Sequence, residues 1–260
     1  MSENSLISLA WEQYIVKLKI DNPPLNVLTN SLLDELDTAF DKVASSEEVR
    51  ALIIYGEGEK AFVAGADIKQ FPSLTEATGK ELVKKGKDIF DKIAQARFPV
   101  ICAVNGLALG GGLELAMACD MRIADEKAKL GLPETGLGII PGYGGTQRLT
   151  RLIGPGKTKE MIYTGEPISA EEALRLGLIE HIASRGKALD EALVIANKIA
   201  AKSPLALSKA KHAINRGGEK SLQEGQKLET ELFGELCVSE DKREGVEAFL
   251  NKRKPEFTGK

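Results

Sequence analysis

Val104-Asn-Gly-Leu-Ala-Leu-Gly-Gly-Gly-Leu-Glu-Leu-Ala-Met-Ala-Cys-Asp120 joins a predicted buried strand to a predicted helix through three consecutive glycines. The apolar run 99–104 predicts the strand, and the Ala-rich segment after the glycines predicts the helix. Glycine has no Cβ, so a ligand can approach the backbone amides of 110–112 closely. The first amides of a helix lack an internal partner and lie at the positive end of its dipole. The stretch therefore predicts a site for an anion, either bound or developing during a reaction.

Glu114 follows the glycines directly. A carboxylate in the first turn of an apolar helix can be a mild partner of the helix dipole. It can equally be a catalytic group beside an oxyanion site. This stretch alone leaves both interpretations open.

Composition limits the classes of protein to consider. The chain has 260 residues, 43% hydrophobic and 28% charged, with a net charge of -3, which gives nucleic-acid binding no overall electrostatic support. No run is long and apolar enough to predict a membrane span. The only histidines are His181 and His212, and no ligand cluster has metal spacing, so we expect no metal site.

The cysteines and the N-terminus indicate a compartment. The chain has three cysteines, Cys102, Cys119 and Cys237, an odd number that cannot all pair within one chain. The first two lie in apolar runs typical of buried thiols, which fits a reducing compartment. Residues 1–5 have no basic start and no long apolar region, so they predict no secretion signal. We expect a cytoplasmic protein, or an organelle protein after removal of its targeting segment.

Hydrophobic periodicity predicts an α/β protein. Apolar patterns predict strands at 7–10, 14–20, 49–55, 99–104 and 121–125, and helices at 31–43 and 80–96. Residues 71–79 are predicted to be a variable loop, and the Gly- and Pro-rich stretch 130–146 to be loop and turn. From about residue 187 only helices are expected, with capping signals such as Ser203-Pro204 and Ser221-Leu-Gln-Glu224. The chain is therefore divided into an α/β core, 1–200, and a helical region, 201–260.

Four motifs in order carry a resemblance to a known family. They are Ala64-Gly-Ala-Asp-Ile-Lys69, Asn105-Gly-Leu-Ala-Leu-Gly-Gly-Gly-Leu-Glu114, Pro133-Glu134 and Ile140-Pro-Gly-Tyr-Gly-Gly-Thr-Gln-Arg-Leu149. Together they resemble the enoyl-CoA hydratase (crotonase) family over nearly the whole chain. The resemblance implies a core of repeated ββα units and a helical C-terminal region used in trimer formation, with trimers pairing into hexamers. It also implies an acyl-CoA thioester substrate and no separate cofactor, because coenzyme A is part of the substrate.

The resemblance also implies roles for individual residues. The amides of Ala66 and Gly111 correspond to the oxyanion hole, and Glu114 and Glu134 to the two catalytic acids. Lys60 and Lys69 correspond to cations near the phosphates of coenzyme A. The full set implied in substrate binding is Lys60, Ala64, Ala66, Asp67, Ile68, Lys69 and Gly142.

The implied reaction is syn addition of water to a trans-2-enoyl-CoA, giving a 3-hydroxyacyl-CoA, with fatty-acid β-oxidation as the pathway. Two carboxyl groups on one face of the substrate can share removal of a proton from water and its delivery to C2. The presence of both Glu114 and Glu134 favours hydration. The alternatives are an enoyl-CoA isomerase, a dehydratase working in the reverse direction, and a non-catalytic acyl-CoA- or RNA-binding member of the family.

Overall fold

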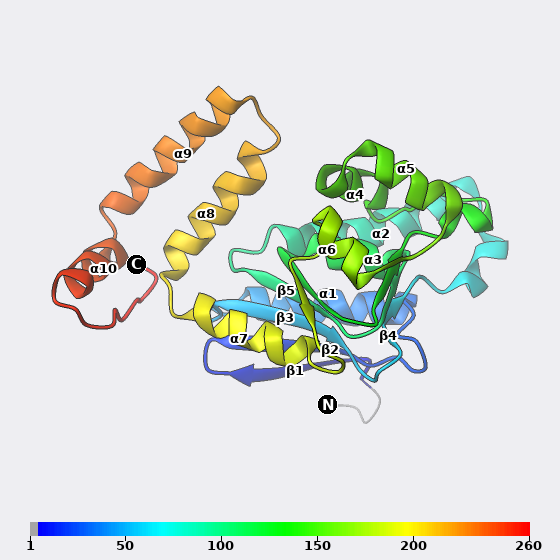
Figure 1. The fold of residues 1–260 in the computed structure, drawn as a ribbon, viewed down its shortest axis with the longest axis horizontal. Helices are drawn as coiled ribbons and strands as arrows, with labels where there is room; N and C mark the ends of the chain where they lie inside the picture. The colour runs from blue at the N-terminus through cyan, green and yellow to red at the C-terminus, as the bar shows by residue number, and fades with distance from the viewer. Residues whose placement is uncertain (1–4) are drawn as a thin grey trace.

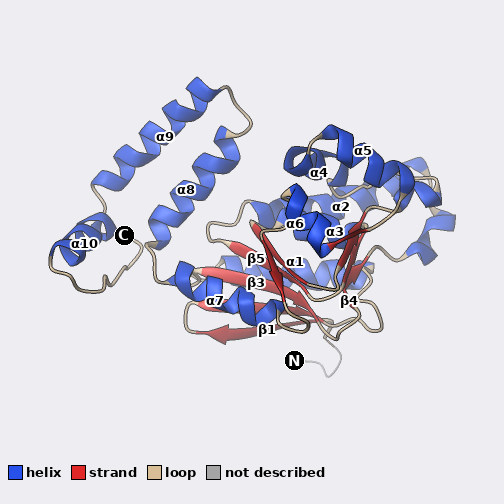
Figure 2. Cartoon of the chain, viewed as in Figure 1, coloured by secondary structure: helices blue, strands red, loops and turns tan. Residues whose placement is uncertain are grey.

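Two β-sheets form the framework of the molecule in a computed structural model, which describes residues 5–260 (Figures 1 and 2). Residues 1–4, most of the stretch analysed for a signal, lie outside the described residues. The larger sheet has the order β1 (Ile7–Glu12), β2 (Ile15–Ile20), β3 (Ala51–Gly56), β5 (Val100–Val104), β7 (Met121–Asp125) and β10 (His181–Ala183). The smaller sheet has the order β4 (Ala61–Ala64), β6 (Leu107–Leu109), β8 (Lys129–Gly131) and β9 (Ile168–Ser169). Only β1–β2 and β8–β9 pair antiparallel; the other described pairings are parallel.

Alternation along the central strands of the larger sheet builds two apolar layers. In β3, Leu52 and Ile54 join the main core, whereas Ala51 and Ile53 join a second cluster on the opposite face. Successive side chains of a strand point to opposite faces, so a strand covered on both sides reads as a continuous apolar run. Helix α7 (Ala188–Ala200) covers the second face with alanines at one-turn spacing, Ala188, Ala192 and Ala196.

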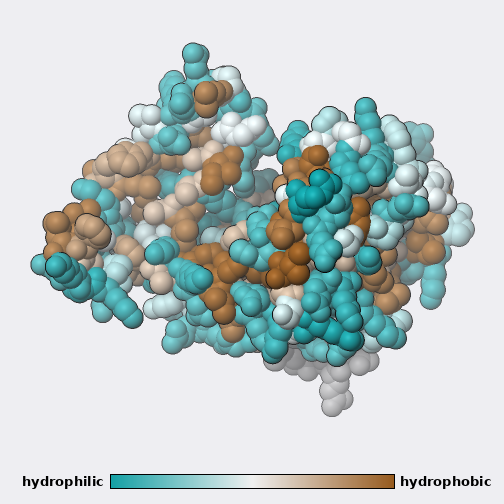
Figure 3. Space-filling view, viewed as in Figure 1, coloured by the Kyte–Doolittle hydropathy of each residue, from teal (hydrophilic) through white to brown (hydrophobic). Residues whose placement is uncertain are grey.

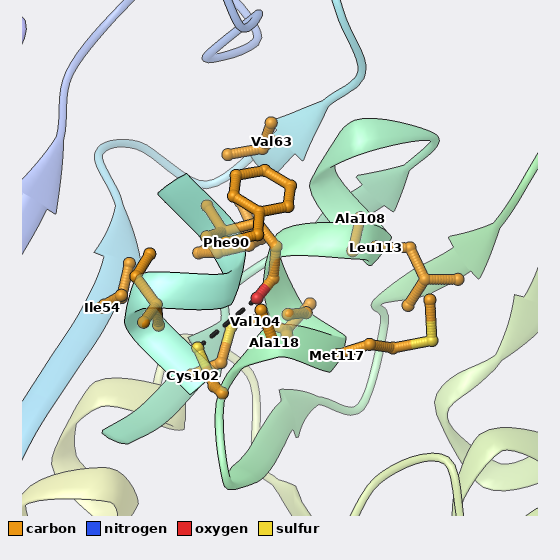
Figure 4. Packing of buried hydrophobic residues seen from close by; sticks show 14 of the residues in the cluster. Ile54, Val63, Phe90, Cys102, Val104, Ala108, Leu113, Met117 and Ala118 are labelled. Atoms are coloured by element: carbon orange, nitrogen blue, oxygen red, sulfur yellow. Dashed lines mark hydrogen bonds between the residues drawn. The ribbon is translucent and has the colours of Figure 1, made fainter. Parts of the chain in front are cut away.

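Helices α1 (Asn30–Ala44), α2 (Glu76–Ala94) and α3 (Gly111–Ala118) contribute to the main core. All eight residues of α3 are buried, consistent with its apolar sequence. Figure 4 shows Phe90 of α2 beside Cys102 and Val104 of β5, with Leu113 and Met117 of α3 nearby. Buried α3 therefore fixes its N-terminal glycines at a precise place in the core.

The element order repeats a ββα unit: β1–β2–α1, β3–β4–α2 and β5–β6–α3. Each first strand joins the large sheet, and the second strands of the later two units join the small sheet. The predicted α/β fold with repeated ββα units is thus confirmed.

Two predicted loops contain regular structure. Residues 71–79 were expected to be a loop, but a 3-10 helix, η1 (Ile68–Ser73), is followed by α2, which Thr75 opens with a capping box. Residues 130–146 contain part of β8, a 3-10 helix η2 (Glu134–Leu137) and the start of α4 (Gly145–Ile153). Elements as short as η1, β8 and η2 have no measurable hydrophobic period, so glycine and proline dominated the prediction.

Three C-terminal helices extend away from the sheets (Figure 1): α8 (Pro204–Gly217), α9 (Leu222–Cys237) and α10 (Glu240–Leu250). Ser203 and Ser221 cap α8 and α9 as expected. Helix α8 contacts the core through the buried side chain of Lys211. Its Nζ donates hydrogen bonds to Asp120 Oδ2 at 2.7 Å and to the Phe98 carbonyl at 3.1 Å. Apolar side chains remain exposed on these helices, seen as brown patches in Figure 3. A boundary at residue 200 stays a prediction.

Helices α4 and α5 (Pro155–Thr164) lie between β8 and β9 along the chain, and α6 (Ala170–Leu176) follows β9. No helix in residues 5–260 has both the length and the apolar character needed to cross a bilayer.

Candidate active site

An apolar pocket lies where the small sheet meets α2, α3 and the segment after β8. Its lining includes two carboxyl groups among mostly apolar and glycine residues. The lining residues are Ala64, Gly65, Ala66, Ile68, Phe71, Leu82, Val83, Leu109, Gly110, Gly111, Glu114, Pro133, Glu134, Leu137, Ile139, Ile140, Gly142 and Tyr143. A mostly apolar pocket with a few convergent polar groups is typical of a small-molecule site.

Parallel pairing of β4 with β6 brings two glycine-containing turns together. Ala64 pairs with Leu109, so the residues that follow each strand lie side by side. Gly65 and Gly110 both have positive φ, 96° and 51°, a backbone region that costs glycine little. These turns lie beside one another, and the residues that follow them, Ala66 and Gly111, line the pocket.

The next amides are those of Ala66 and Gly111. Leu28 bridges this segment: its N–H donates to Gly65 O and its carbonyl accepts from Asp67 N–H, which leaves the Ala66 N–H on the opposite side. Gly111 is the first residue of α3, where an N–H has no partner within the helix. Within residues 5–260, neither amide donates a hydrogen bond to another part of the chain. Two free amides beside one pocket can bind an oxyanion.

Glu114 is held rigidly in the first turns of α3. Its side chain is 1% exposed, and its Oε1 accepts hydrogen bonds from the backbone N–H groups of Tyr143 at 2.8 Å and Gly145 at 2.7 Å. Burial, opposed by the Gly145 hydrogen bond and reinforced by the charge of Glu134, raises the pKa of Glu114 to about 7. The carboxyl group can therefore gain or lose a proton near neutrality.

Glu134 reaches the same pocket from the first residue of η2. A Cβ built on Gly110 would lie 2.8 Å from Glu134 Oε1, so this carboxyl group lies directly against the turn at Gly110. Its Oε2 is buried without a hydrogen-bond partner among the described residues. Burial also raises the pKa of Glu134. An unpartnered buried oxygen needs a ligand or water to satisfy it.

The structure gathers most residues predicted for the site, but not all of them. Ala64, Ala66, Ile68, Gly111, Glu114, Glu134 and Gly142 line the pocket. Lys60 and Lys69 have exposed side chains outside it, at the ends of β4 and in η1, where they could meet a charged part of a ligand. Asp67 also lies outside the lining, and its side chain caps η1 by accepting from Lys69 N–H at 3.1 Å.

Sequence analysis missed Tyr143 and the α2 side of the pocket, Leu82 and Val83. The Tyr143 ring is buried, and burial raises its pKa to about 12, so its hydroxyl stays protonated. The tyrosine belongs to a quoted motif, but nothing in that motif indicates which helix its ring contacts. In residues 5–260 no group of three or more His, Cys, Asp or Glu side chains could hold a metal ion.

Comparison with known proteins agrees with this geometry. A family model described as enoyl-CoA hydratase/isomerase matches residues 11–260. The chain is 47% identical to a probable enoyl-CoA hydratase of Bacillus subtilis, covering 97% of this chain and 98% of the relative. It is 42% identical to a short-chain-enoyl-CoA hydratase of Clostridium acetobutylicum, covering 98% of each. A crystal structure of an enoyl-CoA hydratase from Bacillus anthracis superposes with a TM-score of 0.95 at 41% identity, covering 98% of this chain and 100% of that one.

Proposed function

The chain belongs to the enoyl-CoA hydratase/isomerase family, and from this premise we propose that it adds water to trans-2-enoyl-CoA thioesters, giving 3-hydroxyacyl-CoA. Water loses a proton and forms a C–O bond at C3, and C2 gains a proton. The observation that carries the proposal is one pocket in which the buried Glu114 and the half-buried Glu134 lie beside two unpaired amides. The full-length similarity to proteins named as hydratases supports the same reaction.

The amides of Ala66 and Gly111 stabilise the charge that develops on the thioester oxygen. Attack of water at C3 pushes electrons toward the carbonyl and gives an enolate-like transition state. Fixed N–H donors lower the energy of this state more than that of the substrate. Removal of one such donor typically costs roughly 3–4 kcal/mol of transition-state stabilisation.

Glu114 and Glu134 carry the proton transfers in this proposal. Burial raises the pKa of Glu114 to about 7, so the pair can hold one proton near neutrality, and burial raises the pKa of Glu134 as well. One carboxylate then takes the proton from water while the other group delivers a proton to C2 on the same face, which gives syn addition. Glu134 Oε2, buried and unpartnered, is the oxygen available to the attacking water or its product hydroxyl.

Coenzyme A occupies the outer part of the site in this proposal. Lys60, just before β4, and Lys69, in η1, have exposed side chains, and we assign their ammonium groups to the coenzyme's phosphates. Asp67 orients the Lys69 segment by capping η1. No cofactor beyond the substrate's own coenzyme A enters the mechanism.

We also propose an oligomeric state, a compartment and a pathway. Exposed apolar side chains on α8–α10, including Ile214, Phe233 and Phe249, support assembly into a homotrimer or homohexamer through this region. Buried free thiols at Cys102 and Cys119 support a reducing cytoplasm. Fatty-acid β-oxidation is the proposed pathway, with no nucleic-acid or membrane partner.

Three measurements test these proposals. Loss of conjugated enoyl-thioester absorbance with crotonyl-CoA, together with identification of 3-hydroxybutyryl-CoA, tests hydration. Conversion of a 3-enoyl-CoA to its 2-enoyl isomer without hydration would instead indicate an isomerase. Light scattering of the purified chain tests the oligomer.

A further inference from the structure

The ring of Tyr143 is held between α2 and the first residue of α3. A Cβ built on Gly86 of α2 would lie 2.5 Å from Cε1 and 2.7 Å from Cδ1 of this ring. On the other edge, a Cβ built on Gly111 would lie 3.2 Å from Cδ2 and 3.3 Å from Cε2. Glycine at position 86 is therefore what makes room for the tyrosine.

Further contacts fix the ring in this position. The Phe90 ring, one turn after Gly86 on α2, packs edge-on against Tyr143 with centroids 5.4 Å apart. A Cβ on Gly142 would lie 2.8 Å from Val83 Cγ2, so the backbone beside the tyrosine also lies directly on α2. The Tyr143 N–H is held by Glu114 Oε1. Backbone and ring are thus both immobilised.

The ring forms part of the pocket wall, and α2 at Gly86 lies behind it. Tyr143 and Val83 line the pocket, whereas the buried residues Gly86 and Phe90 do not. The proposed oxyanion amide belongs to Gly111, which the same ring contacts. The wall therefore stands beside the space that the acyl group must occupy.

We propose that Tyr143, seated against Gly86, closes the inner end of the acyl pocket and restricts the enzyme to short-chain enoyl thioesters. This inference rests on the hydratase function proposed above. Tyr143 is the specificity-determining residue, and Gly86 is a positioning residue that acts through it. The hydroxyl group has no part in the restriction, because the ring itself occupies the space.

Removal of the ring would open the pocket toward Gly86 and Phe90. Each additional buried methylene of a longer acyl chain is worth about fourfold in binding when fully accommodated. Tyr143→Ala should therefore raise the ratio of kcat/KM for trans-2-decenoyl-CoA to that for crotonyl-CoA by at least about tenfold. Tyr143→Phe should leave the ratio within about twofold of wild type.

Gly86→Ala gives an independent signature. Its methyl group must displace the ring toward the pocket, so kcat/KM for crotonyl-CoA should fall by at least about tenfold. In the Tyr143→Ala background the same substitution should have almost no effect, because the clash is gone. Gly79→Ala, in the same helix with nothing within 4 Å of a new Cβ, is the matched control and should leave the ratio unchanged.

The experiment measures both substrates on wild type, the four single variants and the Gly86→Ala/Tyr143→Ala double variant, with circular dichroism to verify folding. If Tyr143→Ala does not fold, Tyr143→Leu replaces it and should shift the ratio in the same direction. An unchanged ratio in a folded Tyr143→Ala or Tyr143→Leu protein would overturn the proposal. A wild type that already prefers the ten-carbon substrate would also overturn it.

Binding of saturated acyl-CoA ligands tests the role of Tyr143 separately from the proposed hydratase reaction. If wild type hydrates no 2-enoyl thioester, the proposed reaction fails, but Kd values for butyryl-CoA and decanoyl-CoA still test the wall. Tyr143→Ala should then tighten decanoyl-CoA binding at least about tenfold relative to butyryl-CoA. Equal changes in Kd for butyryl-CoA and decanoyl-CoA would contradict the proposal that Tyr143 limits acyl-chain length, whether or not the protein turns over a substrate.

Discussion

The backbone N–H of Tyr143 donates a 2.8 Å hydrogen bond to Oε1 of Glu114, joining the segment before α4 to the first turns of α3. The same oxygen also accepts from Gly145 N–H. One oxygen of the carboxyl group is therefore committed to the protein backbone, which leaves Oε2 for proton exchange. The orientation of the proposed acid is thus set by residues that do not themselves exchange protons.

The two glutamates should be separately essential. Glu114→Gln and Glu134→Gln should each lower kcat by roughly 10²–10⁴-fold, because an amide neither accepts nor donates the required proton. Binding of a saturated acyl-CoA, measured by calorimetry, should change little. Near-normal turnover in either variant would remove that residue from the mechanism.

The proposed oxyanion amide of Gly111 should tolerate no side chain at its own position. A Cβ there would lie 2.9 Å from Leu28 Cδ1 and against the Tyr143 ring, so Gly111→Val must displace the amide. We expect kcat to fall by at least about 10²-fold. Gly156→Val in α5 is the control, because a Cβ at that position has nothing within 4 Å. Full activity of a folded Gly111→Val protein would contradict the role of the backbone amide.

Burial of Glu114 should make stability depend on pH. Its pKa rises from 4.5 to about 7 on folding, so the native state binds more protons than the unfolded state between these values. Its carboxyl group is neutral in both states below pH 4.5 and penalises folding progressively as pH rises toward 7. Relative to wild type, Glu114→Gln should therefore gain up to about 3 kcal/mol in unfolding free energy across this range.

Urea unfolding at a series of pH values measures this difference. Glu171→Gln, on the exposed surface of α6, is the control and should track wild type. A constant difference between Glu114→Gln and wild type from pH 4 to pH 8 would show that the carboxyl group is not desolvated.

The ion pair between buried Lys211 and half-buried Asp120 should be required to hold α8 on the core. Lys211→Met would leave the half-buried Asp120 carboxylate with the 2.7 Å hydrogen bond from Val100 N–H and the charge of Arg122 to stabilise it. The expected loss is about 3–5 kcal/mol of unfolding free energy, with partial recovery on adding Asp120→Asn. Lys209, also on α8, forms a more exposed ion pair with Glu235 of α9. Lys209→Met removes this pair and should cost less than about 1 kcal/mol of unfolding free energy. Equal losses in the two lysine variants would refute the anchoring role.

No metal is expected in the reaction, because the two amides and two carboxyl groups supply charge stabilisation and proton transfer. Dialysis against a chelator should leave kcat for crotonyl-CoA unchanged. Restoration of lost activity by a divalent ion would contradict this prediction.

The sequence predicted the elements whose physical signals are local. Apolar runs located the strands of the large sheet except β10, and the glycine triplet before an apolar helix located the proposed oxyanion turn and Glu114. Glu134 was identified only through the resemblance, because a single acid in a Gly- and Pro-rich stretch has no distinguishing pattern. The very short strands β8 and β9 were missed for the same reason.

Contacts between residues far apart in the sequence could not be predicted. The contact between Tyr143 and Gly86 joins two elements far apart in the chain, and neither residue's local sequence indicates the other. Gly86 follows several lysines in a helix whose sequence resembles a solvated surface. Only the fold shows that one face of α2 is the wall of the pocket.

Hydration of crotonyl-CoA is the most direct test of the central claim. We predict rapid loss of the enoyl-thioester absorbance with 3-hydroxybutyryl-CoA as the product, abolished by either glutamate-to-glutamine substitution. No loss of absorbance with short, medium or branched 2-enoyl thioesters, in a folded and oligomeric preparation, would contradict the proposed hydratase function.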